Sequence, residues 1–234
     1  MEDKIKQYYR DRVENKDRSD FLWQVGKTVD GVSVPDEQID LIIENIASKL
    51  QLGIKDIVLD IGCANGLLTK KIAGYVTKVT GLELTSELYE VACEYNSHGN
   101  IKYINANILD YEIGEGNDKF TKVYLYEVMQ HLSYQEADML FKKLGDITAD
   151  DVSIFIGGVL DVEKKWNFFD TFERRSRYFT GLLSESDPFG SWYHKDYFNC
   201  LALRHNFDSE CVSQKNRLYT SHYRFDCVLT RKQN

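Results

Sequence analysis

Short apolar runs alternate with longer amphipathic segments along most of the chain. The apolar runs predict strands at residues 57–61, 78–84, 101–105, 119–126, 151–158 and 210–215. Segments with apolar positions three or four residues apart predict helices at residues 67–73, 85–95, 134–147 and 194–207. An alternating segment predicts a closing strand at residues 223–230. Strands and helices that alternate in this way specify an α/β fold with a doubly wound, mostly parallel sheet.

Two segments do not follow this alternation. Residues 1–52 contain a charged helix with Tyr8 and Tyr9 on its apolar stripe, followed by a second helix. We expect this range to form a helical lid, although a helix that is only docked on the domain fits the same pattern. Residues 160–193 are rich in aromatic side chains and predict a helical insert after the fifth strand of a main domain at residues 53–234.

The composition narrows the class of protein. The chain has 234 residues, of which 43% are hydrophobic, so it is long enough to bury a sizeable core. Its net charge of −8 disfavours a nucleic-acid partner, because proteins that bind nucleic acids usually carry a basic surface. The five cysteines form no C-x-x-C pair, which fits reduced thiols in a cytoplasmic protein without a zinc site. We expect no signal peptide and no membrane-spanning segment.

The strongest chemical signal is the turn after the first apolar run. Asp60 lies at the end of that run, and Gly62 and Gly66 enclose Ala64 in the sequence Asp-Ile-Gly-Cys-Ala-Asn-Gly. A glycine lets the backbone pass close to a ligand, as in the nucleotide-binding turns of doubly wound sheets. The dinucleotide fingerprint has a glycine at the place of Ala64, which argues against NAD.

This turn resembles the first motif of class I S-adenosylmethionine (SAM) methyltransferases, and the pattern of that family covers residues 56–230. The resemblance implies SAM as the cofactor, S-adenosylhomocysteine as its product, and a Rossmann-like seven-stranded sheet with an antiparallel last strand. It implies no metal. The cofactor-binding residues that it implies are Asp60, Gly62, Cys63, Ala64, Gly66, Glu83, Leu84, Asn107, Ile108, Tyr126, Glu127 and Gln130.

The resemblance also assigns roles to several of these residues. Glu83 lies about 20 residues after Gly62, where the family places an acidic residue that accepts both ribose hydroxyls. The family usually has an aspartate where Asn107 stands, and asparagine can still accept a hydrogen bond from the adenine amino group. Ile108 is placed to cover the adenine, and the segment at residues 126–130 faces the methionine end of SAM.

Three residues are candidates for acid–base chemistry. His131 is placed near the methyl group and titrates near neutrality, so it can take a proton from an acceptor hydroxyl; a histidine that orders the loop or binds cofactor is the alternative. Tyr9 joins the site if the first helix closes over it. His194 is a further candidate, with a helix-capping role as the alternative.

The acceptor is expected to be a small molecule with a hydroxyl or an amine, such as a sugar, a nucleotide-linked sugar or a natural-product precursor. Its expected binding residues are Tyr8, Trp23, Arg174, Arg175, Arg177, Trp192 and Tyr193. The arginines favour an anionic acceptor, because a guanidinium matches phosphate and carboxylate oxygens; a solvated basic helix face is the alternative.

Other functions remain compatible with the sequence. Within the methyltransferase family, the acceptor can be a protein or an RNA. Outside it, the same sheet is compatible with an NAD-linked oxidoreductase or with a non-catalytic protein that retains a cofactor pocket. The quaternary state that we expect is a monomer or a homodimer.

Overall fold

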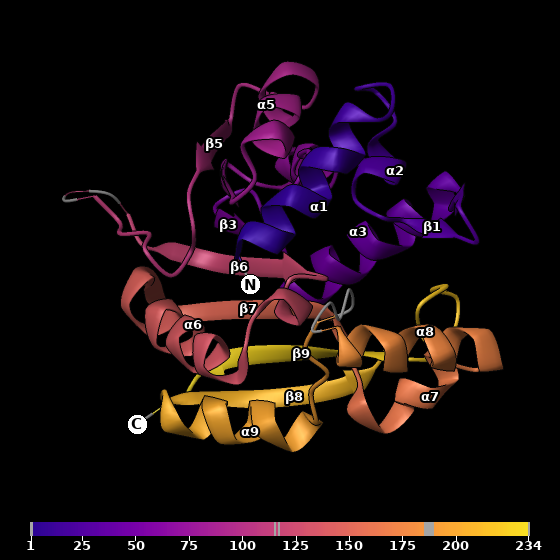
Figure 1. Ribbon diagram of the computed structural model, residues 1–234. Helices are drawn as coiled ribbons and strands as arrows, with labels where there is room; N and C mark the ends of the chain where they lie inside the picture. The colour runs from indigo at the N-terminus through magenta and orange to yellow at the C-terminus, as the bar shows by residue number, and fades with distance from the viewer. Residues whose placement is uncertain (1, 115, 117, 185–189, 234) are drawn as a thin grey trace.

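The computed structural model describes residues 2–233 except 115, 117 and 185–189, and a single seven-stranded sheet runs through it (Figure 1). The strands are β3 (Ile57–Ile61), β4 (Lys78–Glu83), β5 (Ile101–Asn105), β6 (Phe120–Tyr126), β7 (Thr148–Leu160), β8 (Phe207–Ser213) and β9 (Arg224–Arg231). Their order across the sheet is β5-β4-β3-β6-β7-β9-β8. The first five strands in this order are parallel, and β9 runs antiparallel to both of its neighbours. The expected doubly wound sheet with an antiparallel last strand is confirmed.

Helices cover both faces of the sheet, because its central strands are apolar on both sides. They are α3 (Asp36–Leu50), α4 (Leu67–Ile72), α5 (Ser86–Tyr95), α6 (Tyr134–Ile147) and α9 (Lys195–Arg204). On one face α3 and α4 bury Ile42 and Ile72 completely, and on the other α6 and α9 bury Leu140 and Phe198 completely. Within the described part of the chain, every helix is too short or too polar to span a bilayer.

Two local differences from the sequence prediction have simple causes. β8 begins before the expected strand at residues 210–215, because Phe207 is fully buried and pairs with Arg231. A hairpin of β1 (Thr28–Val29) and β2 (Val32–Ser33) precedes α3, and strands of two residues are too short to show an alternating pattern.

The range expected as a lid contains two parts with different roles. α1 (Glu2–Glu14) and α2 (Phe21–Gln24) lie outside the sheet, and α1 runs beside α5 (Figure 1). An ion pair between Arg10 Nε and Glu87 Oε1, 2.6 Å apart, joins α1 to α5. By contrast, α3 belongs to the core, since its Ile46 is fully buried against the sheet. The lid proposal is therefore confined to the segment that precedes α3.

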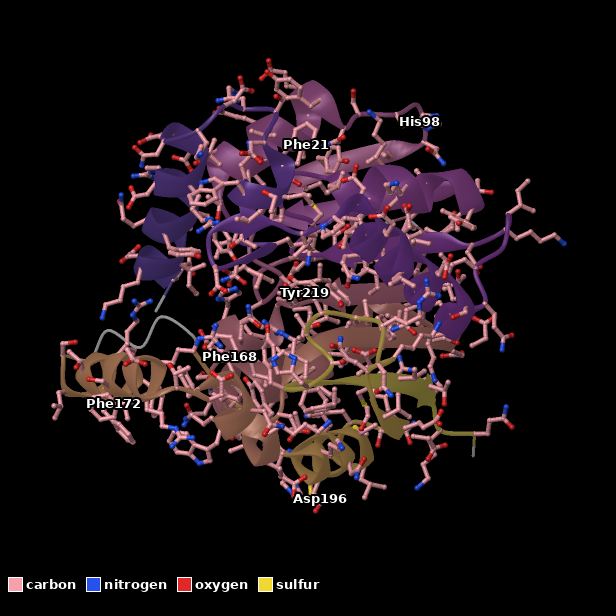
Figure 2. The ribbon with its side chains drawn as sticks, turned by 90° about the vertical axis from the view of Figure 1, so that its right-hand side faces the viewer. Phe21, His98, Phe168, Phe172, Asp196 and Tyr219 are labelled. Carbon is pink, nitrogen blue, oxygen red and sulfur yellow. The ribbon has the colours of Figure 1, made fainter. Side chains whose placement is uncertain are left out.

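The insert that follows β7 is helical, as expected. Its elements are η3 (Val162–Lys164), α7 (Lys165–Phe168) and α8 (Phe172–Leu183). The inner side packs Phe169 and Tyr178 against Trp192. On the outer side Phe172 and Leu183 are 80% and 89% exposed, and Figure 2 shows Phe172 at the edge of the molecule.

A buried carboxylate links the centre of the sheet to the helix after the glycine turn. Asp60 in β3 is 2% exposed, and its Oδ2 accepts hydrogen bonds of 2.6 Å from Thr69 Oγ1 in α4 and from Tyr124 OH in β6. Burial raises the pKa of Asp60 to about 7, although the two hydroxyl donors work in the opposite direction. The carboxylate therefore holds the strand end and the helix start in one arrangement.

Asp60→Asn is expected to change how stability depends on pH. The folded protein holds the Asp60 proton up to about pH 7, whereas the unfolded chain releases it near pH 4, so the free energy of unfolding of the wild type falls between these values. The slope from one such group is at most about 1.4 kcal/mol per pH unit. Urea unfolding at several pH values should show that the wild type loses stability relative to Asp60→Asn as the pH rises from about 4 to 7.

The matched control is Asp150→Asn, because Asp150 is exposed. Its stability is expected to follow the wild type at each pH. A constant difference between wild type and Asp60→Asn over the whole range would contradict the raised pKa of Asp60.

Candidate active site

A pocket lies at the carboxyl ends of β3, β4, β5 and β6, and α1 contributes Glu2, Ile5 and Tyr9 to its wall. Neighbouring parallel strands bring their carboxyl ends to the same edge of a sheet, which is why residues far apart in sequence meet here. All of the expected cofactor-binding residues except Gly66 line this pocket: Asp60, Gly62, Cys63, Ala64, Glu83, Leu84, Asn107, Ile108, Tyr126, Glu127 and Gln130.

The glycine turn has the backbone shape that a closely held ligand requires. Gly62 has a φ of +69°, and a Cβ at this position would lie 2.6 Å from a methyl group of Val128. Gly66 has a φ of +78°, and a Cβ there would clash with Tyr103, so this glycine is needed for packing behind the pocket. Ala64 also lies in the left-handed region, with a φ of 50°. Its strain is offset by the hydrogen bond that its amide makes.

Glu83 joins the two turns that form the floor of the pocket. Its carboxylate accepts a 2.8 Å hydrogen bond from the Ala64 amide and a 2.7 Å hydrogen bond from the Thr85 amide. The residue is 6% exposed, and burial raises its pKa even though these amides favour the charged form. A carboxylate oxygen can accept more than one hydrogen bond, so this group is suited to accept hydrogen bonds from vicinal hydroxyls as well.

Asn107 is already engaged by the protein. Its Oδ1 accepts a 3.0 Å hydrogen bond from the Leu109 amide, and its Nδ2 donates a 3.2 Å hydrogen bond to Glu2 Oε2 of α1. Ile108 beside it is 7% exposed and lines the pocket. The start of α1 therefore closes this end of the site, and the expected adenine contact of Asn107 stays a proposal.

Tyr9 and His131 meet at the other end of the pocket. Tyr9 OH lies 3.1 Å from His131 Nε2, and the two rings are perpendicular. Burial, with the nearby Arg224 charge, lowers the pKa of His131 to about 4, and burial raises the pKa of Tyr9. Both groups are therefore neutral at pH 7, and Tyr9 can donate its proton to Nε2 when the histidine carries its own proton on Nδ1.

A buried ion pair lies beside these two residues. Lys27 Nζ lies 3.2 Å from Glu127 Oε2, with side chains that are 6% and 14% exposed, and both residues line the pocket. Burial acts to raise the pKa of Glu127, but Lys27 and Arg224 outweigh it and hold that pKa below its ordinary value. Lys27 was not expected at the site, because only the fold of the β1–β2 hairpin region brings it to Glu127.

Arg224 is a second functional candidate that sequence reasoning missed. It is the first residue of β9, is 8% exposed, and donates through Nη1 a 2.6 Å hydrogen bond to Gln130 Oε1. An isolated arginine at the start of an alternating strand carries no sequence signal, since such positions are usually solvated. Its proximity to Gln130 follows from the insertion of β9 beside β7.

His194 lies outside the pocket. It is the N-cap of α9, where its Nδ1 accepts a 3.1 Å hydrogen bond from the Asp196 amide, and its side chain is 44% exposed. Figure 2 shows Asp196 at one end of the molecule and Tyr219 near its middle. His194 therefore caps α9, which is the alternative role expected from the sequence, and it does not line the pocket.

The residues expected around the acceptor are also dispersed. Arg174 pairs with Asp30 and Asp170, and Arg175 donates to the Phe169 carbonyl. Arg177 is exposed on α8, as is Tyr8 on α1.

The expected aromatic residues lie outside the pocket as well. The Trp23 ring packs under the Arg12 guanidinium at 4.5 Å. Trp192 and Tyr193 are buried in the packing beneath the insert, where Tyr193 OH donates a 2.6 Å hydrogen bond to the Leu132 carbonyl. These three aromatic residues therefore pack against other parts of the protein. Their predicted contact with the acceptor stays a prediction.

The pocket fits SAM on two observations. A side chain at Gly62 would fill the space beside Val128, and the buried Glu83 carboxylate faces the same cavity with acceptor capacity to spare. Among the described residues, no three or more His, Cys, Asp or Glu side chains are grouped as metal ligands.

Solved structures show the same fold. The magnesium protoporphyrin IX methyltransferase of Synechocystis PCC 6803, solved with S-adenosylhomocysteine bound, superposes with a TM-score of 0.67 at 14% identity, over 99% of this chain and 100% of that one. At this identity the likeness concerns the fold alone.

Curated relatives match a part of the chain. A ribosomal RNA small subunit methyltransferase A of Caldanaerobacter subterraneus subsp. tengcongensis is 29% identical over 44% of this chain and 40% of its own length. A sphingolipid C9-methyltransferase of Gibberella zeae is 26% identical over 58% of this chain and 27% of its own length. The chain thus spans less than half of the length of these relatives.

The family model described as ribosomal RNA adenine dimethylase matches residues 39–156, which is half of the chain. The matched range includes the glycine turn, Glu83, Asn107 and the segment around His131. Together with the fold, this match confirms the expected cofactor, which is SAM. The chain belongs to the ribosomal RNA adenine dimethylase family, within the class I SAM-dependent methyltransferases.

Proposed function

We propose that this protein transfers the methyl group of SAM to a small acceptor held between α1 and the carboxyl ends of the strands. The observation that carries the proposal is the contact of 3.1 Å between Tyr9 OH and His131 Nε2. It places a residue of α1 directly against the segment after β6, so the methyl end of the pocket is closed by the chain's own first helix. A pocket covered by this helix fits a small molecule better than a base within a large polymer.

In this proposal each part of the pocket has a separate task. Glu83 holds the ribose hydroxyls, Ile108 covers the adenine, and Lys27 with Glu127 borders the methionine end. SAM supplies a methyl group on a positively charged sulfur, which is already a strong electrophile. The protein therefore has to align the acceptor with that group and exclude water, and α1 does the latter.

Tyr9 and His131 provide for the proton of an acceptor hydroxyl. When the acceptor oxygen forms its bond to the methyl carbon, the carbon–sulfur bond breaks and its electron pair stays on sulfur. The hydroxyl proton passes to neutral His131 Nε2, either directly or by way of Tyr9, which gives its own proton to Nε2 and takes the acceptor's. An amine acceptor that is already deprotonated needs no such base for its attack.

An adenine in RNA is the second candidate acceptor, and the names of the relatives favour it. The family model and the Caldanaerobacter relative both refer to ribosomal RNA, which weighs against our expectation of no nucleic-acid partner. However, the family match ends at residue 156 and begins at residue 39, so it leaves out α1, Lys27, the insert and Arg224. A relative named for a sphingolipid matches 58% of this chain too, and the chain carries a net charge of −8. These observations support the small acceptor as the first candidate.

Glu83→Ala is expected to weaken the binding of S-adenosylhomocysteine by on the order of 2–4 kcal/mol, because two hydrogen bonds to a charged group are lost. Titration calorimetry measures this change. Glu90→Ala on α5 is the matched control, since Glu90 is exposed and should leave the affinity unaltered. Equal affinities for Glu83→Ala and the wild type would remove Glu83 from the cofactor site.

His131→Ala is expected to lower kcat for a hydroxyl acceptor by roughly 10²- to 10⁴-fold, which is the usual contribution of a general base. In the wild type, the pKa of about 4 keeps His131 neutral from pH 8 down to about pH 5. Protonation of His131 should therefore not lower kcat within this range. His194→Ala, outside the pocket, should retain turnover. Full turnover of His131→Ala at saturating acceptor would end its role as the base.

The acceptor class is tested with SAM labelled on its methyl group, incubated with the protein and an extract of its source. We expect the label in the small-molecule fraction after separation by size. Label that sediments with ribosomal RNA and is released as methyladenine on nuclease digestion would instead establish the second candidate. Label in neither fraction, with S-adenosylhomocysteine still bound, would contradict both.

A further inference from the structure

Arg224 has more hydrogen-bonding capacity than its neighbours use. Nη1 donates to Gln130 Oε1 at 2.6 Å and to the Gly158 carbonyl. Nε is buried and has no hydrogen-bond partner among the described residues. A buried donor without a partner costs free energy, and Arg224 contacts Gln130, which lines the pocket, so this donor is a candidate for a ligand contact.

Arg224 shares its nearest carboxylate influence with a second buried cation. Lys27 and Arg224 are two buried cations, whereas the one carboxylate that both of them stabilise is Glu127. His131 lies close enough for the Arg224 charge to lower its pKa, and it adds no charge at pH 7. Glu127 forms its ion pair with Lys27, and among the described residues no carboxylate lies within ion-pair distance of Arg224, so an anionic group of a ligand would give this buried cation a partner. The positively charged sulfur of SAM would add a further cation to this site.

Arg224 lies on the side of the site where we propose that the acceptor binds. β9 lies beyond β7, whereas the glycine turn and Glu83 follow β3 and β4 on the opposite side of β6. Arg224 contacts Gln130, one residue before His131, and its guanidinium lies 5.2 Å from the centre of the Tyr223 ring. Figure 2 shows Tyr219, from the loop that leads to β9, near the middle of the face between the N-terminal and C-terminal elements.

We propose that Arg224 binds an oxyanion of the acceptor, a carboxylate or a phosphate-type group, and so selects anionic acceptors and positions them beside His131. The inference rests on the proposed small acceptor and assigns its chemical class. Arginine suits this task, because its planar guanidinium presents several N–H donors to such oxygens. The anionic acceptor expected from the arginines of α8 is thus retained, with a different residue to hold it.

A purely structural role for Arg224 makes a different prediction. Its bond to Gly158 supports the irregular pairing between β7 and β9, where the register shifts between Ile156 and Val159. If this were its whole role, replacing it would lower the melting temperature and would impair every acceptor and the cofactor alike. A ligand role instead appears as a change in acceptor KM and in acceptor choice.

The test uses Arg224→Met and Arg224→Lys in the full chain, with Arg231→Met as the matched control. Arg231 lies in the same strand and also donates to a backbone carbonyl, that of Gly145, but at the other end of the sheet. Methyl-labelled SAM is first incubated with wild-type protein and the small-molecule fraction of the extract, and the labelled product is applied to an anion exchanger at neutral pH. Kinetics with the purified acceptor then follow for each variant.

We expect the labelled product to be retained by the exchanger. Arg224→Met should raise the acceptor KM roughly 10- to 100-fold, the equivalent of losing a hydrogen bond to a charged group, with the affinity for S-adenosylhomocysteine unchanged. Arg224→Lys should recover part of this loss, and Arg231→Met should show none of it. Millimolar inorganic phosphate should compete with the acceptor in the wild type and lose this effect in Arg224→Met.

Contrary results separate this inference from the proposed function. A neutral or cationic labelled product would overturn the anion-binding role of Arg224 while small-molecule methylation stands. A loss of S-adenosylhomocysteine affinity in Arg224→Met as large as the change in KM would assign the anion to the cofactor's own carboxylate and also overturn it. Absence of any labelled small molecule is instead the failure of the proposed function.

Discussion

The hydrogen bond from the Ala64 amide to the Glu83 carboxylate is the interaction on which the site depends. It joins the turn after β3 to the turn after β4 at a distance of 2.8 Å, and it offsets the left-handed backbone of Ala64. Asp60 fixes the same turn from below through Thr69 and Tyr124. Two buried carboxylates thus set the shape of the floor, and burial raises the pKa of both, because a low-polarity interior disfavours their charged forms.

The roof of the pocket is built differently. α1 touches the strands' carboxyl ends through polar contacts, namely Glu2 with Asn107 and Tyr9 with His131, and it is joined to α5 by the partly exposed Arg10–Glu87 pair. Exposed ion pairs contribute little stability, and the buried packing of Val13 against Leu88 and Val91 supplies a second attachment of α1 to α5. In the function that we propose, this roof excludes water during the reaction.

The two halves of the site differ in how widely their features are shared. The family match covers the floor and the segment around His131. Lys27 and Arg224 come from segments outside the matched range. A cofactor floor common to a family, combined with residues outside the matched range, is consistent with one fold accommodating unrelated acceptors.

Sequence alone was sufficient for the sheet, the glycine turn and Glu83, because these depend on local periodicity and on a fixed spacing along the chain. His131 lines the pocket because the segment that follows β6 lies at the carboxyl edge of the sheet. Only the tertiary structure brought Lys27 to Glu127, Arg224 to Gln130 and Tyr9 to His131, and it left the arginines of α8 outside the pocket. The physical reason is that these contacts join residues about 90 to 120 positions apart, and the packing of α1 and β9 that creates them has no local signature.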